Sequence, residues 1–423
     1  MSDGAWGLGH DCFGFGHIVK KVLIIEVKVV SLQAEKSLIM DKDAIIQEFE
    51  LHFGSYTKGR VYFAPGRINL IGEHTDYNGG FVFPGAVQQG IIAKVRPNKA
   101  RKVRLWAPDL HRGCTFDLDD EKGPEETDFR YVYGVVREMM ARGIKVKGFE
   151  AVYGGDVPLG AGMSSSAALE CCFAYALNDL FGGGLFGKRL DRMELARVGQ
   201  ATEHKYVGTM CGIMDQFISM HGREGSLVRL DCRSGEFEYY PWHPKGYRLV
   251  LVNSCVKHEL VGSPYNDRRR SCERVAQMAG VETLRDCTWE MLERLKEQVG
   301  EEDYRRAKYV LGEYDRVMAV CDALQKDDYE TVGQQMYLTH EGLSKDYEVS
   351  CEEIDFLVEV ARRCGVTGSR IMGGGFGGCT INLVKDECHD AFVAEVQRSY
   401  RERFGVECKV IPVVIGGGAK RVD

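Results

Sequence analysis

The sequence contains no apolar run long enough to cross a membrane. A spanning helix needs about 18 or more consecutive apolar residues, and the most apolar stretch, residues 22–32, is interrupted by Glu26 and Lys28. That stretch also lacks the small-residue cleavage site of a signal peptide. We therefore expect neither a membrane partner nor a secretory leader.

The sequence also lacks an excess of basic charge, has little proline and has no closely paired cysteines. The net charge of −7 argues against a nucleic-acid partner, which would normally meet a basic face. Only 10 of the 423 residues are Pro whereas 50 are Gly, so the glycines belong to specific tight loops rather than to a low-complexity linker. The 15 cysteines include no Cys-x-x-Cys pair. This pattern predicts reduced, mostly buried thiols in a cytoplasmic protein.

The length of the chain indicates two to three domains. Residues 1–39 differ from the rest, with a Gly- and His-rich start followed by a short Val/Ile/Lys run. After Met40, the apolar residues Ile45, Ile46, Phe49 and Phe53 follow helical spacing. We expect residues 1–39 to be a peripheral extension that packs few core contacts and holds no site residue. Two α/β domains should follow, over residues 40–240 and 241–423.

Local patterns place the main elements along the chain. Strands are predicted from residue 60, with hairpins to residue 95, and near 149–152, 226–230, 237–240, 247–254 and 408–415. Helices are predicted after residue 40, after 165, over 191–207, from about 212, and over 302–326, 351–364 and 389–404.

The strongest local feature is PLGAGMSSSAALE, residues 158–170, which we call the second motif. Its small residues let a ligand approach the backbone, and the helix that follows directs free N–H groups and its positive dipole end at that ligand. Serine hydroxyls can add donors or bind Mg²⁺ through oxygen. The motif lacks the Gly-Lys-Ser/Thr of a Walker A loop. The alternative is an ordinary Ser-capped helix after a glycine turn.

The first motif is GRINLIGEHTDYNGG, residues 66–80. Arg67, Glu73, His74 and Asp76 fall within ten residues, between glycines, and could bond several hydroxyls of a small polar ligand. The alternative is a charged surface turn. A metal cluster is disfavoured because Glu73-His74 lacks a helical His partner.

The third motif is GSRIMGGGFGGCTINLV, residues 368–384. Gly373, Gly375 and Gly378 match the dinucleotide-binding pattern, but the apolar run that follows predicts a strand rather than the required helix. We expect instead a close-packed glycine loop that supports a site. Two acids elsewhere, Glu203 and Asp215, are not distinguished from surface residues by their neighbours.

Taken together and in this order, the three motifs resemble those of the GHMP family of small-molecule kinases, and within it the galactokinases. Residues 211–222, 253–273 and 346–357 are similar as well, and the likeness runs from about residue 56 to the C-terminus. The resemblance implies an α/β (α+β type) two-lobed GHMP kinase fold with the active site in the cleft between the lobes. It implies ATP-dependent phosphorylation of galactose at the anomeric hydroxyl, with galactose 1-phosphate and ADP as products, the first committed step of galactose use.

The resemblance also implies residue roles. Asp215 would be the catalytic base, or the residue that orients the anomeric hydroxyl, and Arg67 would stabilise its alkoxide character and the transferring charge. The sugar pocket would consist of Arg67, Glu73, His74, Asp76, Gly212, Asp215 and Tyr265. The phosphates of ATP would lie on Gly160, Ala161, Gly162, Met163, Ser164, Ser165, Ser166 and Ala167. Mg²⁺ would be held by Ser166 and Glu203, the supporting loop would include Gly374 and Gly375, and the enzyme would be a monomer.

The sequence departs from the family in two places. Many galactokinases carry Trp-x-Asn-Tyr before a Gly-Val pair, but residues 128–135 read DFRYVYGV, so no adenine contacts are assigned. Met163 replaces the usual Leu, a tolerable apolar exchange. Two alternatives are a kinase for another sugar, such as N-acetylgalactosamine, and a non-catalytic sensor of galactose and ATP. The galactose-like residues 75–79 argue against the first, and the complete serine loop with Asp215 argues against the second.

Overall fold

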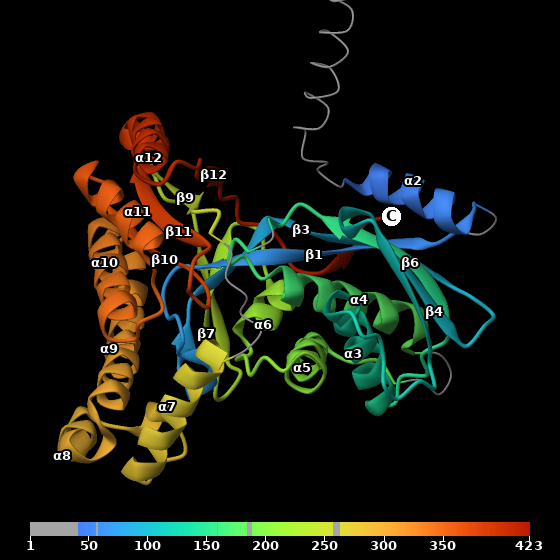
Figure 1. Ribbon diagram of the computed structural model, residues 1–423, viewed down its shortest axis with the longest axis horizontal. Coiled ribbons are helices and arrows are strands. Elements are labelled where there is room, and N and C mark those ends of the chain that lie inside the picture. The colour runs from blue at the N-terminus through green and yellow to red at the C-terminus, as the bar shows by residue number, and fades with distance from the viewer. Residues whose placement is uncertain (1–40, 56–57, 159, 184–187, 257–262) are drawn as a thin grey trace, which may run out of the picture. The chain divides into compact units, whose positions relative to one another are not determined.

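The structure is a computed structural model that describes residues 41–55, 58–158, 160–183, 188–256 and 263–423 (Figure 1). The predicted extension over residues 1–39, including the apolar stretch 22–32, lies outside the described residues. Asp41–Asp423 form one compact unit by themselves. No described helix is both long enough and apolar enough to pass through a bilayer.

The larger sheet belongs mainly to the first half of the chain and has six strands in the order β13-β1-β3-β6-β4-β5. All neighbours are antiparallel except β4 and β6. The strands are β1 (Arg60–Asn69), β3 (Pro84–Pro97), β4 (Lys102–Ala107), β5 (Arg112–Asp117), β6 (Phe149–Gly155) and β13 (Lys420–Arg421). The long β1–β3 pairing confirms the hairpin predicted between residues 60 and 95.

Helices cover both faces of this sheet (Figure 1). The helix α2 (Lys42–Phe53) begins where the Asp41 side chain accepts a hydrogen bond from the N–H of Ala44, and it buries Ile45 and Phe49. The opposite face carries the helices of the second motif and its surroundings. They are α3 (Thr127–Ala141), α4 (Ser165–Phe181), α5 (Arg192–Thr202) and α6 (Met214–His221).

The helix predicted over residues 191–207 is confirmed in its extent, but its last five residues are not regular α-helix. Regular α-helix ends at Thr202, and residues 203–207 form a single π-helical turn. The N–H groups of Gly208 and Thr209 both donate to the Glu203 carbonyl, at 2.8 and 3.1 Å. Such wider turns are frequent at functional sites.

The second half builds a four-stranded sheet in the order β10-β11-β9-β12. A small third sheet pairs β2, from the segment between β1 and β3, with the β7–β8 hairpin. The strands are β9 (Tyr247–Asn253), β10 (Gly368–Ile371), β11 (Cys379–Lys385), β12 (Lys409–Pro412), β2 (Phe81–Val82), β7 (Ser226–Asp231) and β8 (Phe237–Pro241). The helices are α7 (Ser263–Ala279), α8 (Trp289–Val299), α9 (Glu301–Leu324), α10 (Tyr329–Lys345), α11 (Glu352–Arg363) and α12 (His389–Phe404).

The strand predicted after the third glycine loop is confirmed, since β10 and β11 form an antiparallel hairpin around it. The helices predicted over 302–326, 351–364 and 389–404 are also confirmed. The sequence analysis predicted no helix at the positions of α3, α7, α8 and α10. In α10, Gly333 and Gly342 weaken the helical signal. Packing requires the first of these, since a Cβ at Gly333 would collide with the Thr367 carbonyl.

The last predicted strand is shorter than expected. The strand β12 ends at Pro412, Ile415 then bridges to Val87, and β13 pairs with β1. The end of the chain therefore returns to the sheet of the first half. The domain boundary predicted near residue 240 falls at the end of β8 and stays a prediction.

Candidate active site

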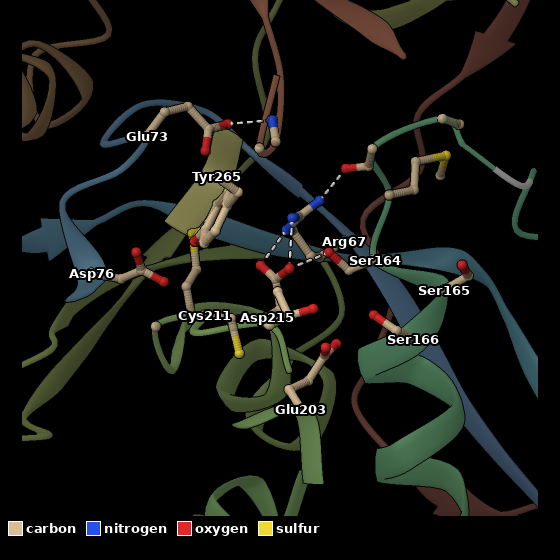
Figure 2. A pocket seen from close by; sticks show the side chains of 18 of the residues that line it. Arg67, Glu73, Asp76, Ser164, Ser165, Ser166, Glu203, Cys211, Asp215 and Tyr265 are labelled. Atoms are coloured by element: carbon tan, nitrogen blue, oxygen red, sulfur yellow. Dashed lines mark hydrogen bonds and ion pairs between the residues drawn. The ribbon is translucent and has the colours of Figure 1, made fainter. Parts of the chain in front are cut away.

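The three motifs meet at one pocket of about 180 Å³ (Figure 2). Tyr265, Gly373 and Gly374 line it from the second half of the chain, and the first half supplies the rest. The predicted residues that line it are Arg67, Glu73, His74, Asp76, Gly160, Ala161, Gly162, Met163, Ser164, Ser165, Ser166, Glu203, Gly212, Asp215, Tyr265 and Gly374.

Asp215 and Arg67 form a bidentate ion pair in this pocket (Figure 2). The Arg67 Nε and Nη2 atoms donate to the two carboxylate oxygens of Asp215 at 2.7 and 2.8 Å. The Ser164 hydroxyl also donates to Asp215, and Arg67 Nη1 donates to the Gly162 carbonyl. The Arg67 side chain is 4% exposed and that of Asp215 is 28% exposed. The carboxylate is thus held in one orientation while it remains open to a ligand.

A β-bulge brings Arg67 to this position. The register of β1 against β3 shifts between Pro65 and Arg67, which bends the strand locally. The Arg67 N–H then donates to the Met163 carbonyl at 3.0 Å. Gly66 permits this approach, because a Cβ there would lie only 2.7 Å from the same carbonyl. The first and second motifs are therefore joined through their backbones.

The second motif is not an ordinary serine-capped helix. Ser164 has left-handed backbone geometry, with φ 58°, and its side chain makes no capping bond to α4. Its hydroxyl donates a hydrogen bond to Asp215 instead. The first N–H groups of a helix have no partner within the helix, so the start of α4 keeps donors for an anionic ligand.

The wall opposite the second motif is formed by the first motif and Tyr265. Burial, together with the charge of Arg268, lowers the pKa of His74 to about 3, so the ring is neutral at pH 7. Its Nδ1 lies 2.8 Å from the Tyr77 hydroxyl, and its ring centroid lies 5.5 Å from that of Tyr265.

Asp76 is the buried acid of this wall. Burial, and secondly the charge of Asp215, raises the pKa of Asp76 to about 6. The N–H of Tyr77 donates to its Oδ1 at 3.0 Å. A Cβ at Gly212 would collide with the Asp76 carboxylate, so the absence of a side chain there lets the two segments meet. Gly212 thus supports the site by its size as well as by lining it.

Glu73 also bonds to the third motif, which the sequence did not predict. Its Oε1 accepts hydrogen bonds from Arg370 Nη1 at 3.1 Å and from the Gly373 N–H at 2.8 Å. Its Oε2 makes no hydrogen bond to the described residues. One oxygen of the carboxylate is therefore committed to the protein, and the other remains for a ligand.

Ser166 and Glu203 lie on the side of the pocket away from the first motif (Figure 2), and both could bind a metal through oxygen. Burial raises the pKa of Glu203 to about 7, an effect opposed by the Ser166 hydroxyl and strengthened by the charge of Asp215. Mg²⁺ in kinases is typically bound by one or two carboxylates together with substrate phosphates. A hydroxyl and a carboxylate beside the start of α4 fit that chemistry.

Comparisons with known proteins agree with this geometry. Residues 47–97 match the galactokinase galactose-binding signature, residues 130–223 the GHMP kinases N terminal domain, and residues 321–402 the GHMP kinases C terminal family. The galactokinase of Thermotoga neapolitana is 38% identical over 361 residues, which cover 85% of this chain and 99% of that protein. The galactokinase of Glaesserella parasuis is 40% identical over 367 residues, covering 85% and 94%.

The chain belongs to the galactokinases of the GHMP kinase family. The crystal structure of the Lactococcus lactis galactokinase complexed with galactose superposes with a TM-score of 0.84 at 33% identity, covering 90% of this chain and 99% of the other. Mevalonate kinase of Methanococcus jannaschii superposes with a TM-score of 0.62 at 17% identity, which shows the shared fold. The predicted GHMP kinase fold is thereby confirmed.

Two residues predicted for the galactokinase site do not line the pocket. Ala167 is buried within the first turn of α4. Gly375, with φ 89°, packs against Val349, where a Cβ would lie 2.5 Å from the carbonyl oxygen. Both therefore support the loops beside the pocket.

Two buried charged residues behind the galactokinase site were missed. Glu170 lies one turn after Ser166 on α4, and its Oε2 accepts a hydrogen bond from Gln216 at 3.1 Å. Burial, and secondly the charge of Glu203, holds the pKa of Glu170 well above its ordinary value. Arg370 lies at the start of the third motif, between Ser369 and Ile371, on a strand that is buried at every position. A charged residue directly before the apolar Ile371-Met372 pair was the signal available in the sequence.

Proposed function

We propose that this protein transfers the γ-phosphoryl group of ATP to the anomeric hydroxyl of galactose, giving galactose 1-phosphate and ADP. The observation that carries the proposal is the Arg67–Asp215–Ser164 cluster, which lies where the first and second motifs meet. The galactose bound in the Lactococcus lactis relative supports the choice of sugar.

The anomeric hydroxyl would lie against the open side of Asp215. As its oxygen bonds to the γ-phosphorus and the bridging P–O bond of ATP breaks, its proton passes to the Asp215 carboxylate. Arg67 stays beside both groups and stabilises the negative charge that spreads over the transferring phosphoryl. Such transfer depends mainly on positioning and on neutralising charge, and the ion pair supplies both.

The second motif would hold the triphosphate. Its glycines allow close backbone approach, and the first turn of α4 presents N–H donors to the β- and γ-phosphates. Ser166 and Glu203 would hold Mg²⁺, which when bound neutralises phosphate charge. A metal is expected to matter here because the described lining residues carry one arginine against four carboxylates, Glu73, Asp76, Glu203 and Asp215.

The remaining polar groups of the pocket would bind the other hydroxyls of the sugar and so select it. Glu73 Oε2, His74 and Asp76 are candidates for its other hydroxyls, with Gly212 and Tyr265 closing the pocket. We further propose a monomer in the cytoplasm, with a boundary between its two lobes near residue 240. The cytoplasmic assignment is supported by the cysteines of the described residues, which are all free thiols.

An ADP-release assay with galactose, glucose and N-acetylgalactosamine tests the proposal. We expect turnover with galactose, and kcat/KM lower by about 10-fold or more with glucose, because the inverted hydroxyl leaves a buried polar group unpaired at about 1–3 kcal/mol. A higher kcat/KM for N-acetylgalactosamine would assign another sugar kinase. Galactose and ATP binding without ADP release would instead indicate a sensor.

A further inference from the structure

The third motif is packed between the first and second motifs. On one side, the Gly373 N–H donates to Glu73 Oε1 at 2.8 Å. On the other side, a Cβ at Gly373 would lie 3.1 Å from the Gly162 carbonyl, and a Cβ at Gly162 would lie 2.8 Å from the Met372 carbonyl. The two loops therefore touch backbone to backbone, and neither can move far without the other.

Arg370 connects this layer to the first motif. Its side chain is completely buried, at 0% exposure. It donates to the Leu70 carbonyl at 2.9 Å, to the Asn69 carbonyl, and to Glu73 Oε1 at 3.1 Å. A fourth bond, of 2.6 Å, goes to the carbonyl of Ile371 beside it. One guanidinium thus links β10 to the end of β1 and to the loop that follows it.

Other buried groups hold the opposite side of the first motif against α9. The Glu313 carboxylate accepts a hydrogen bond from the Gly72 N–H at 2.8 Å, and the Tyr309 hydroxyl donates to the Glu73 carbonyl at 3.0 Å. Both contacts are buried. We therefore expect a change in the orientation of the Glu73 carboxylate to move the Gly373 N–H rather than the groups behind the loop.

We propose that Arg370 and Glu73 are positioning residues that couple the two substrate sites. A sugar hydroxyl on Glu73 Oε2 would fix the plane of the carboxylate, and Oε1 would then hold Gly373, and through it Gly162, in the geometry that receives the phosphates. The proposal rests on the proposed function. Since binding coupling is reciprocal, nucleotide would favour the sugar as much as the sugar favours nucleotide.

Calorimetry of galactose binding, with and without a non-hydrolysable ATP analogue and Mg²⁺, tests the coupling. In the unaltered protein we expect the galactose Kd to fall by about 5-fold or more when the analogue is present, within the usual range of such coupling. Arg370→Lys keeps the charge but loses the fork of donors, and should bring the ratio of the two Kd values close to one.

Arg96→Lys is the matched control. Arg96 is also buried, and it donates to Glu150 at 2.6 Å and to the carbonyls of Phe53 and Gly54 at 2.6 and 2.9 Å, none of which lines the pocket. It should lose comparable stability and keep the ratio of the unaltered protein. A purely structural role for Arg370 would give the same result as this control.

Glu73→Gln provides a second variant if Arg370→Lys does not fold. It preserves the volume and removes the carboxylate that faces Arg370, so the ratio should again approach one. A ratio of one in the unaltered protein, or an unchanged ratio in the folded variants, would overturn the coupling. Failure of the unaltered protein to bind galactose would instead count against the proposed function.

Discussion

Asp215 shows how a single side chain acquires its role from its partners. It lies in the first turn of α6, and three donors reach it from β1 and from the second motif: Nε and Nη2 of Arg67 and the hydroxyl of Ser164. No local pattern around residue 215 indicates these contacts. The residue type was predictable through the resemblance, whereas the orientation depends on segments far away in the sequence.

Asp215→Asn should lower kcat with galactose by about 10²-fold or more, the usual scale for a positioned acid–base group. Sugar binding and the fold should be retained, because the shape of the side chain is unchanged. Steady-state ADP release and galactose titration measure the two effects separately.

Asp303→Asn is a close structural match for that test. Asp303 also lies in the first turn of a helix. Its carboxylate accepts two hydrogen bonds from Arg274, at 2.7 and 2.8 Å, and a third from the Ser271 hydroxyl. It does not line the pocket, so its replacement should leave kcat near normal. Equal kcat values for the two variants would remove the catalytic role of Asp215.

Asp76→Asn should stabilise the protein at neutral pH. The pKa of Asp76 is raised from 3.8 to about 6, chiefly by burial. Between those values the folded state binds more protons than the unfolded state, so stability falls as pH rises through this window. Removing the charge should raise Tm more at about pH 8 than at about pH 5, by about 1 °C per kcal/mol gained for a folded unit of this size.

The same substitution should weaken galactose binding by about 10-fold, because an acceptor for its hydroxyls is lost. Asp109→Asn is the control for the effect on galactose binding. Burial also raises the pKa of Asp109, and its carboxylate accepts a hydrogen bond from the Gly155 N–H, away from the pocket. A lower Tm for Asp76→Asn at about pH 8 would contradict the assigned shift.

At the scale of elements, the site depends on loops that approach one another more closely than side chains permit. Gly160, Gly162 and Gly378 all have φ near 70–80°, and a Cβ at Gly378 would lie 3.1 Å from the Gly160 carbonyl. The glycine count indicated tight loops, and the third motif was predicted to be close-packed. That it packs on the second motif became evident only from the contacts between them.

Gly162→Ala should therefore raise the KM for ATP by about 10-fold or more, because the methyl group would press on the Met372 carbonyl at 2.8 Å. Gly280→Ala separates this effect from backbone strain alone. Gly280 has a similar φ of 72° and nothing within 4 Å of the added Cβ, so the variant should lose about 1 kcal/mol of stability and keep its KM. Kinetics and thermal melting of both variants decide whether the loop contact matters.

For the whole molecule, the described fold begins at Asp41. The relative from Thermotoga neapolitana aligns over 99% of its own length with 85% of this chain. The first described helix, α2, belongs to the packed unit, since the guanidinium of Arg96 lies 4.8 Å from the Phe49 ring and Trp106 Nε1 donates to Glu48 at 3.2 Å.

A chain that starts at Met40 should fold and phosphorylate galactose at nearly the full rate, because terminal segments are dispensable unless they are paired into the fold. A chain that starts at residue 55 should lose several kcal/mol, since it lacks the buried Ile45 and Phe49 of α2. Expression, Tm and turnover of the two truncations provide the test. Loss of most activity on starting at Met40 would show that residues 1–39 belong to the domain.

The sequence by itself determined the residue types of the three motifs, the order in which they occur and most of the regular elements. These depend on local periodicity and on glycine positions, which a one-dimensional pattern preserves. It could not show the π-helical turn at Glu203, since that turn depends on how α5 packs and on the bonds that Gly208 and Thr209 make. Helix α10 was missed because Gly333 is needed for contact rather than for helix formation.

Only the tertiary structure decided which atoms of the site are already engaged. Glu73 and Arg370 are 297 residues apart in the chain, and Glu73 and Gly373 are 300 apart. Whether a buried carboxylate oxygen bonds to the protein or stays available for a ligand depends on such pairings, because most buried polar groups bond to partners that are near in space rather than in sequence. Two features of the site therefore became visible only in the folded structure. One carboxylate oxygen of Glu73 bonds to the protein while the other stays available for a ligand, and the Ser164 hydroxyl bonds to Asp215 instead of capping a helix.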